Sequence, residues 1–336
     1  MGALKPATIA KAAFFAALIL LPLVSDSSYV RHVSIVAILY AVMVSSWNLT
    51  LGYAGVFNFG HMAFFAIGAY AAGILTKVYD FSPWLGLPAG IAAAVIASVV
   101  VCIPVLRLKG IYVVLVTFAF SQLCFQIVLN QRDLTGGSFG LVQIPPLAIG
   151  DFSFRDHQNL GYYYAALVLL ALSTLFCARL MRSDFGRTVV ALRDNEAYAT
   201  SRGVALARVR LMIFMASAIF TGATGALYAQ YTRSASPDMF GFAFITLALS
   251  MLLLGGIGTI WGPILGAVVF TLVSESMVGL GPGRYLVIAV MIVVILRFFP
   301  RGLIAALEAV GRRLARRPDP PPAPSAGRDA AGAPAA

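Results

Sequence analysis

The chain has 336 residues, of which 60% are hydrophobic and 11% charged, and its formal net charge is +11. Soluble domains carry about 25% charged residues, so this composition excludes an ordinary soluble protein and indicates an integral membrane protein. The arginines gather in short stretches beside apolar segments, which is typical of membrane orientation signals and argues against nucleic-acid binding.

Apolar segments of roughly spanning length follow one another along the chain. A helix needs about 20 residues to cross the hydrocarbon core, and most of these segments reach that length. The sequence therefore predicts an all-α fold, a polytopic transmembrane helical bundle of about ten spans. The predicted spans are 8–24, 33–51, 55–78, 84–106, 111–130, 161–181, 209–231, 240–257, 259–279 and 284–300.

Two glycine-rich stretches, 49–60 and 255–266, interrupt the apolar pattern. Irregular backbone at membrane depth is tolerated only where protein or a water-filled cavity surrounds it, so broken or re-entrant helices are expected there. Both stretches contain the pattern Leu-Gly-x-x-Gly, beginning at Leu51 and at Leu254. Five positions in glycine-rich helices can match by chance, so this possible internal repeat has little weight in the prediction.

The positive charges predict the orientation of the spans. The connection 182–210 holds six arginines and is predicted to lie in the cytoplasm. Counting spans from there places the stretch 131–160 outside and both the N- and C-termini in the cytoplasm. Lys77 and Arg233 are single exceptions to this rule.

Acidic residues are nearly absent from the predicted spans. Of 13 acidic residues, only Glu275 lies deep enough in a span to matter. Proton- or sodium-coupled carriers need carboxylates near the membrane midplane, and the chain also lacks a G-x-x-x-x-G-K-[ST] phosphate loop. We therefore expect energy to come from another protein. Glu275 either takes part in transport or faces an aqueous vestibule.

The segment from Gly52 to Gly68 is the candidate wall of a transport pathway, because small residues allow close helix packing and broken helices. Within it, Asn58, Gly60 and His61 are the predicted pathway residues. For His61 a second interpretation stays open, in which the imidazole binds a backbone carbonyl freed by the broken helix.

The most distinctive polar stretch runs from Ser183 to Gly203. Ser183 or Asp184 can cap the start of a helix, and Gly203 suits the left-handed residue that ends one. Mixed charge without proline predicts a short helix parallel to the membrane that docks a cytoplasmic partner. The alternative is a solvated connector, although a connector between two spans needs only a few residues.

Three blocks of sequence carry a resemblance to a known family. The first is NLTLGYAGVFNFGHMAFFAIGAY from Asn48 to Tyr70, and the second is LRLKGIYVVLVTFAF from Leu106 to Phe120, followed by Leu-Thr-Gly-Gly at 134–137. The third runs from Gly186 to the Phe-Pro-Arg-Gly-Leu at 299–303. In this order they resemble the LivM-type permease subunits of branched-chain amino acid ABC importers, over most of the chain up to about residue 303. One departure is Asn58, where many members carry serine.

The resemblance implies a set of partners and a location. A LivM-type subunit pairs with a second LivH-type permease in the bacterial inner (plasma) membrane. Two cytoplasmic ABC ATPase subunits hydrolyse ATP, a periplasmic or lipid-anchored binding protein delivers substrate, and this chain binds no cofactor itself. Residues 1–305 then form the transmembrane permease domain, and the Pro/Ala-rich residues 306–336 form a disordered cytoplasmic tail.

The stretch 186–203 resembles the family's coupling helix, which sits in a groove on an ATPase subunit. The candidate coupling residues are Gly186, Arg187, Arg193, Asp194, Asn195, Glu196 and Gly203.

The predicted function is that of a permease subunit, not an enzyme, in an ATP-driven importer of branched-chain or related amino acids. It is expected to work by alternating access, with the coupling helix biasing two states. The first alternative is an ion-coupled secondary transporter of a small organic solute, acting alone. The second is a membrane scaffold or sensor, which predicts a folded terminal domain that the 301–336 segment is too short and too Pro-rich to supply.

Overall fold

The computed structural model describes residues 27–149, 152–277 and 302–305, together with the single positions 18, 279, 281, 283, 289, 290 and 297. Within these residues the chain is mostly helical, its only strands are four of two residues each, and loops join the elements, which confirms the prediction of an all-α membrane protein. The elements in chain order are α2 Ser28–Asn48, η1 Leu49–Tyr53, α3 His61–Gly73, η2 Ile74–Val78, α4 Pro83–Val105, α5 Ile111–Asn130, α6 Arg132–Thr135, η3 Gly137–Phe139, β1 Leu141–Val142, β2 Ala148–Ile149, β3 Phe152–Ser153, α7 Asp156–Arg182, α8 Asp184–Asp194, α9 Glu196–Ser201, α10 Leu206–Thr232, β4 Ser234–Ala235, η4 Pro237–Phe240, α11 Phe242–Gly255 and α12 Gly262–Ser276.

Six described helices are long and apolar enough to cross a membrane. Two shorter ones, α11 and α12, have 14 and 15 residues and cover most of the predicted spans 240–257 and 259–279. The predicted spans 8–24 and 284–300 lie outside the described residues apart from isolated positions, so the count of ten stays a prediction. The six long helices are Ser28–Tyr53, His61–Val78, Pro83–Val105, Ile111–Asn130, Gln158–Arg182 and Leu206–Thr232.

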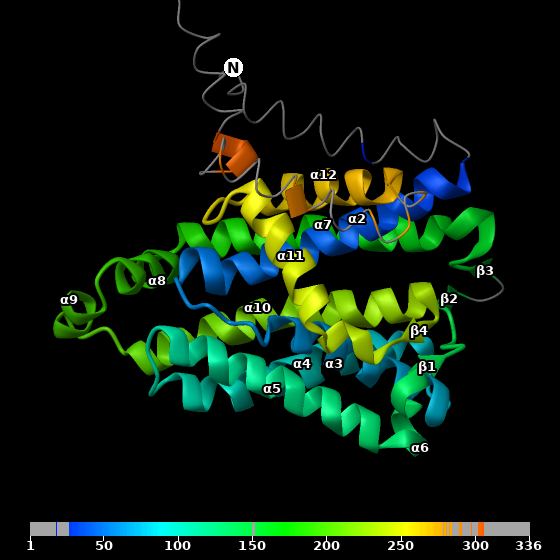
Figure 1. Cartoon of the computed structure of the whole chain (residues 1–336), viewed down its shortest axis with the longest axis horizontal. Helices are drawn as coiled ribbons and strands as arrows, with labels where there is room; N and C mark the ends of the chain where they lie inside the picture. The colour runs from blue at the N-terminus through cyan, green and yellow to red at the C-terminus, as the bar shows by residue number, and fades with distance from the viewer. Residues whose placement is uncertain are drawn as a thin grey trace, which may run out of the picture.

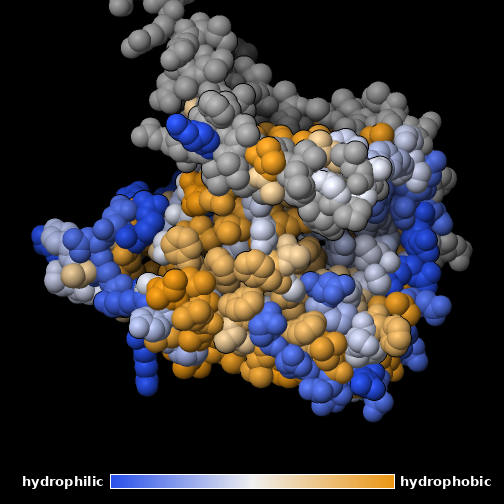
Figure 2. All heavy atoms as spheres, in the orientation of Figure 1, coloured by the Kyte–Doolittle hydropathy of each residue, from blue (hydrophilic) through white to orange (hydrophobic). Residues whose placement is uncertain are grey.

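The long helices run along one axis of the bundle, and the polar connections lie at its two ends (Figure 1). The α8–α9 connection forms one end, and the short strands β1 to β4 lie at the other. Figure 2 shows hydrophobic residues across the middle and hydrophilic residues gathered at both ends, the surface that a bilayer-spanning protein needs. The side of the membrane on which each end lies, and with it the position of both termini and of the 306–336 tail, stays a prediction.

Three helices meet backbone to backbone through glycines. Gly68 of α3, Gly90 of α4 and Gly222 of α10 lie against one another with no side chain between them. A Cβ atom built at Gly222 would lie 2.6 Å from the carbonyl oxygen of Gly90, and one at Gly68 would lie 2.5 Å from that of Gly222. Since hydrophobicity gives helices in lipid no reason to associate, such close packing is a main source of cohesion. We call α3, α4 and α10 the glycine-packed trio.

Replacing Gly222 with leucine is expected to destabilise the folded protein. The new side chain would overlap the backbone of α4, and overpacking a tight core costs about 1–3 kcal/mol. Thermal unfolding in detergent measures the effect. The matched control is Ala171→Leu on α7, which adds the same bulk at an exposed position and should leave the unfolding temperature unchanged. Equal unfolding temperatures for the Gly222→Leu variant and the wild type would contradict the packing role.

The end of the bundle opposite α8 and α9 is held together by pairings between residues far apart in the sequence. Strand β1 pairs antiparallel with β4, so the connection 131–160 is fastened to the end of α10. Lys77 donates to the carbonyl of Val142, and Arg233 donates to the carbonyl of Ile144 at 3.1 Å. The two cations that break the charge rule therefore have a structural task at this end.

Both glycine-rich stretches interrupt helices, as expected. Helix α2 continues into the π-helical turn η1 and then into non-helical residues 54–60. We call this whole stretch, 49–60, the first break. Helices α11 and α12 are separated by residues 256–261, the second break. Helix α11 is about 21 Å long at 1.5 Å per residue, shorter than a bilayer core of about 30 Å. Figure 1 shows α11 running steeply across the direction of its neighbours.

Candidate functional site

An arginine connects α8 to the first break. Arg193 lies in the last turn of α8, and its Nη1 donates a hydrogen bond to the carbonyl oxygen of Gly52 at 3.2 Å. Carbonyls at the C-terminal end of a helix lack intrahelical donors and carry partial negative charge, so a cation there is stabilising. The guanidinium is held by Asp194, whose Oδ1 accepts from Nε and pairs with Nη2, both at 2.9 Å.

Gly55 gives Arg193 the space to reach this carbonyl. Gly55 has a φ of +66°, and a Cβ atom there would lie 2.7 Å from Cγ of Arg193. Both the backbone conformation and the close approach therefore require glycine at this position.

The first and second breaks contact each other through Asn48, the last residue of α2. Its Nδ2 donates to the carbonyl of Thr259 at 2.7 Å, and its Oδ1 accepts from the backbone N–H of Gly258 at 2.9 Å. A Cβ atom at Gly52 would lie 2.6 Å from the nitrogen of Gly258. The two copies of Leu-Gly-x-x-Gly thus meet in space. We call Asn48, Gly52, Arg193, Gly258 and Thr259 the break junction.

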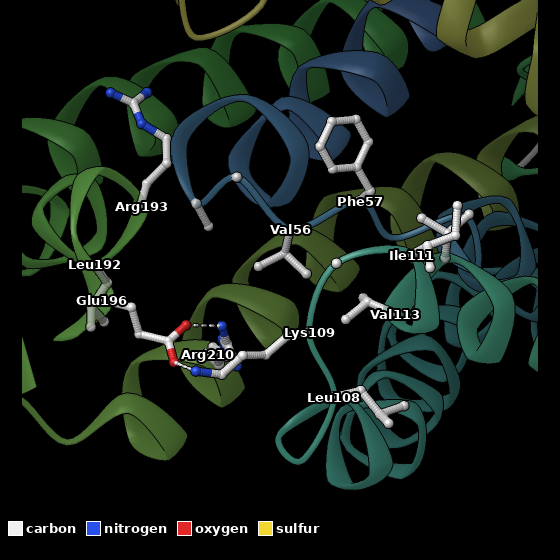
Figure 3. A pocket seen from close by; sticks show the side chains of 14 residues that line it. Val56, Phe57, Leu108, Lys109, Ile111, Val113, Leu192, Arg193, Glu196 and Arg210 are labelled. Atoms are coloured by element: carbon white, nitrogen blue, oxygen red, sulfur yellow. Dashed lines mark hydrogen bonds and ion pairs between the residues drawn. The ribbon is translucent and has the colours of Figure 1, made fainter.

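A second connection fastens α9 to the same region. Glu196 pairs with Lys109 at 2.9 Å and with Arg210 of α10 at 2.8 Å, as Figure 3 shows. The hydrogen bond from Lys109 is the largest cause that lowers the pKa of Glu196, and the nearby Arg210 charge lowers it further. A cavity of about 530 Å³ lies between these side chains and the first break, with Phe57 and Ile111 on its apolar wall.

The lowered pKa of Glu196 predicts a pH dependence. Its ion pairs stabilise the fold above the ordinary pKa of 4.5, and this contribution is lost as the pH falls below that value. We expect Glu196→Gln to be less stable than the wild type near pH 7. The pair with the exposed Lys109 contributes less than about 1 kcal/mol, and the pair with the part-buried Arg210 contributes more. The unfolding temperatures of the two proteins should converge in acid. A difference that grows in acid would contradict this assignment.

The predicted coupling residues lie together at the α8–α9 end, but in two helices and not in the single helix expected from the sequence. Asn195 has extended backbone angles and separates them, and its Oδ1 accepts from the N–H of Tyr198 to cap α9. Ser183 caps α8, as expected, and Gly203 follows α9 with a φ of +88°. An N-cap residue before Glu196 was a readable signal for this second helix start.

The remaining coupling candidates differ in environment. A Cβ atom at Gly186 would lie 2.5 Å from the carbonyl of Leu180, so this glycine packs α8 tightly against the end of α7. Arg187 has a side chain that is 77% exposed and pairs only with Asp184 within the described residues, at 3.4 Å. It is available to a partner and does not touch either break.

Three of the four predicted pathway residues gather in one buried cluster. Asn58 accepts from the N–H of Gly60 at 3.0 Å, and a Cβ atom at Gly60 would lie 2.8 Å from the carbonyl of Thr117 in α5. A bulky residue at Gly60 would therefore displace α5. These residues pack the first break against α5, and their role in the pathway stays a prediction.

His61 is fully buried in the same cluster and stacks on Trp47. Its Nε2 lies 2.8 Å from Oγ1 of Thr221 and 3.4 Å from the carbonyl of Met43, so the imidazole joins α3 to α10 and α2. Glu275 lies apart from this cluster, near the end of α12, where its backbone carbonyl accepts from Tyr29 at the start of α2. Within the described ranges, no group of three or more His, Cys, Asp or Glu residues is placed to hold a metal ion.

Comparison with known proteins identifies the family. Residues 29–296 match the family described as branched-chain amino acid transport system / permease component. The chain is 31% identical to the high-affinity branched-chain amino acid transport system permease protein LivM of Escherichia coli, covering 90% of this chain and 77% of the relative. It is 26% identical to a probable LivM permease of Methanocaldococcus jannaschii, covering 79% and 90%.

A further relative is the LivH permease of Escherichia coli, 24% identical over 80% of this chain and 92% of the relative. No solved structure is significantly similar to this chain. The matches confirm the prediction of a LivM-type membrane permease and its assignment as a transport subunit. The chain belongs to the family of permease components of branched-chain amino acid transport systems.

Proposed function

We propose that this chain is the permease subunit of an ATP-driven importer that carries branched-chain or related amino acids by alternating access. The family match and the names of the relatives support the substrate class. The observation that carries the coupling mechanism is the hydrogen bond between Arg193 and Gly52. Because it joins α8 directly to a broken membrane helix, a displacement of α8 reaches the bundle without an intermediate element.

Two ABC ATPase subunits are the proposed source of that displacement, with ATP bound and hydrolysed by them alone. They dock on the α8–α9 end, which then faces the cytoplasm of a bacterial cell inner membrane. The exposed cations Arg187 and Arg202 are available for this contact. A second permease of LivH type completes the pore, and similarity to both LivM and LivH relatives supports such a pair. A binding protein on the opposite side delivers the substrate.

The test is uptake by the complete complex in proteoliposomes, with the ATPases facing outward and binding protein plus radiolabelled leucine enclosed inside. Leucine should leave the lumen only when ATP is added outside, and an ionophore that collapses ion gradients should not change the rate. Movement of leucine out of the lumen that continues without ATP and stops with the ionophore would support an ion-coupled carrier. ATP-dependent movement of other solutes but not leucine would contradict the substrate class.

A further inference from the structure

One face of α5 is exposed along the whole length of the helix. Tyr112, Leu115, Ala119, Gln126 and Asn130 are all exposed and lie within a narrow arc, because their spacings of three, four and seven residues return to the same side of a helix. Gln126 and Asn130, the last two of these five in sequence, carry amide side chains, whereas the neighbouring exposed residues Leu123 and Ile127 are apolar.

A further amide, Gln122, lies one turn before Gln126 and is partly exposed. No side-chain hydrogen bond joins either amide to a protein atom within the described residues. Gln122 is about 16 Å from the start of α5 and about 12 Å from its end, at 1.5 Å per residue. It therefore lies near the middle of a helix just long enough to cross the hydrocarbon core.

The exposed faces of two other long helices differ from this one. On α4, the exposed residues include Ile96 and Val100, with 65% and 54% exposure, and no polar side chain is exposed between Pro83 and Val105. On α7, the exposed residues between Gly161 and Ala178 are also apolar. These are the surfaces that lipid requires. An amide facing lipid would leave its donors and acceptor unpaired, which is costly. The amides of α5 are thus suited to a polar environment within an otherwise apolar exposed face.

The buried side of α5 contacts the first break, and another side of the helix contacts α11. The N–H of Phe59, in the first break, donates to Oγ1 of Thr117 in α5 at 3.0 Å. On the other side, Phe118 packs edge-on against Phe242 at the start of α11. Helices α5 and α11 both lie at the front of Figure 1, and Figure 2 shows hydrophilic residues interrupting the apolar surface in that part of the molecule.

We propose that Gln122 and Gln126 line the aqueous transport pathway and bind the carboxylate and ammonium groups of the passing amino acid. This rests on the proposed function, with the opposite wall supplied by the second permease. An amide both donates and accepts hydrogen bonds, so it pairs with either charged group of a zwitterion. Because it is neutral, it does not retain either group strongly, and conduction requires that a bound solute also leave. The contact between Phe59 and Thr117 gives the first break a route to move this wall.

The test measures water access at single cysteines in the complete complex. Cys102, Cys124 and Cys177 are first replaced with serine or alanine in a variant that still transports. Gln122→Cys should then react with a membrane-impermeant cationic thiol reagent at least about ten times faster than Ile96→Cys, which also lies near the middle of its helix, because the reactive thiolate forms where water reaches it. Excess leucine should slow the reaction of the Gln122→Cys variant only.

Two results would overturn the proposal. Equally slow reaction at both positions would show that this face is not wet. Fast reaction at Gln122→Cys only when the second permease is absent would show a protein contact instead of a pathway. Independently, Gln126→Leu should lower uptake about tenfold with unchanged complex yield, since one lost amide contact is worth about that factor. The cysteine comparison does not require leucine to be the substrate, so it can succeed where the proposed function fails.

Discussion

Replacing Arg193 with alanine is expected to lower ATP-dependent uptake at least about tenfold while the complex still assembles in the membrane. The change removes the donor to the Gly52 carbonyl and leaves that carbonyl and Asp194 without their partner. A lost partner of this kind costs about 1–3 kcal/mol, enough to shift a two-state equilibrium tenfold or more. ATP hydrolysis should continue, because the alanine variant keeps the exposed surface of α8 that we assign to the ATPases.

The matched control is Arg208→Ala in the first turn of α10. It removes an equal charge from an exposed side chain that has no assigned part in coupling or in ATPase docking. The coupling role would be supported if both variants give a normal complex yield and only Arg193→Ala loses uptake while it still hydrolyses ATP. Reversing the charges of Arg193 and Asp194 together should have the same effect, because an acidic residue cannot donate to the Gly52 carbonyl. Normal uptake by either variant would contradict the assignment.

Replacing Asn48 with leucine is expected to impair both stability and transport. The substitution keeps the branched shape of the side chain but puts two methyl groups in place of the amide oxygen and nitrogen. It removes both hydrogen bonds that join the two breaks, leaving the N–H of Gly258 and the carbonyl of Thr259 without this partner. We expect a loss of about 1–3 kcal/mol in the free energy of unfolding and a clear fall in uptake per folded complex. Thermal unfolding and uptake, measured on the same preparation, separate the two effects.

Ser46→Ala is the control for Asn48→Leu. Ser46 is buried in the same helix, but its hydroxyl donates only to the carbonyl of Val42 within that helix. Its removal should change stability little. Normal uptake per folded complex in Asn48→Leu would show that the contact serves stability alone.

The sequence predicts the helical class and the helix interruptions because both depend on local composition. Apolar length indicates spans, and clustered glycines indicate the stretches where helices end. The pattern Leu-Gly-x-x-Gly at 51 and 254 gave a weak hint that the two interruptions are related. Their contact was not predictable, since it joins residues 210 positions apart through a single amide at the end of α2. Periodicity carries no information about such pairings.

The candidate site was likewise predictable from the sequence only in part. Charge and capping residues located the α8–α9 end, although the helix start after Asn195 was missed. The hydrogen bond from Arg193 to the carbonyl of Gly52 could not be predicted from the sequence. Composition and spacing do not distinguish the arginines of the stretch 182–210, and only the folded structure shows which of them reaches that carbonyl. Gln122 and Gln126 were missed for a similar reason. A predicted span does not reveal which of its polar residues face a neighbour and which face outward.

The glycine-packed trio divides the bundle into parts that can and cannot change their relative positions. Helices whose backbones touch at Gly68, Gly90 and Gly222 have no intervening side chains to change rotamer, so they cannot slide past one another without losing contact altogether. Helices α5 and α11 are outside this unit and meet it through side chains. A cycle of opening and closing would then be a rotation of two rigid bodies, with its axis near the first break, and not a uniform deformation of the bundle.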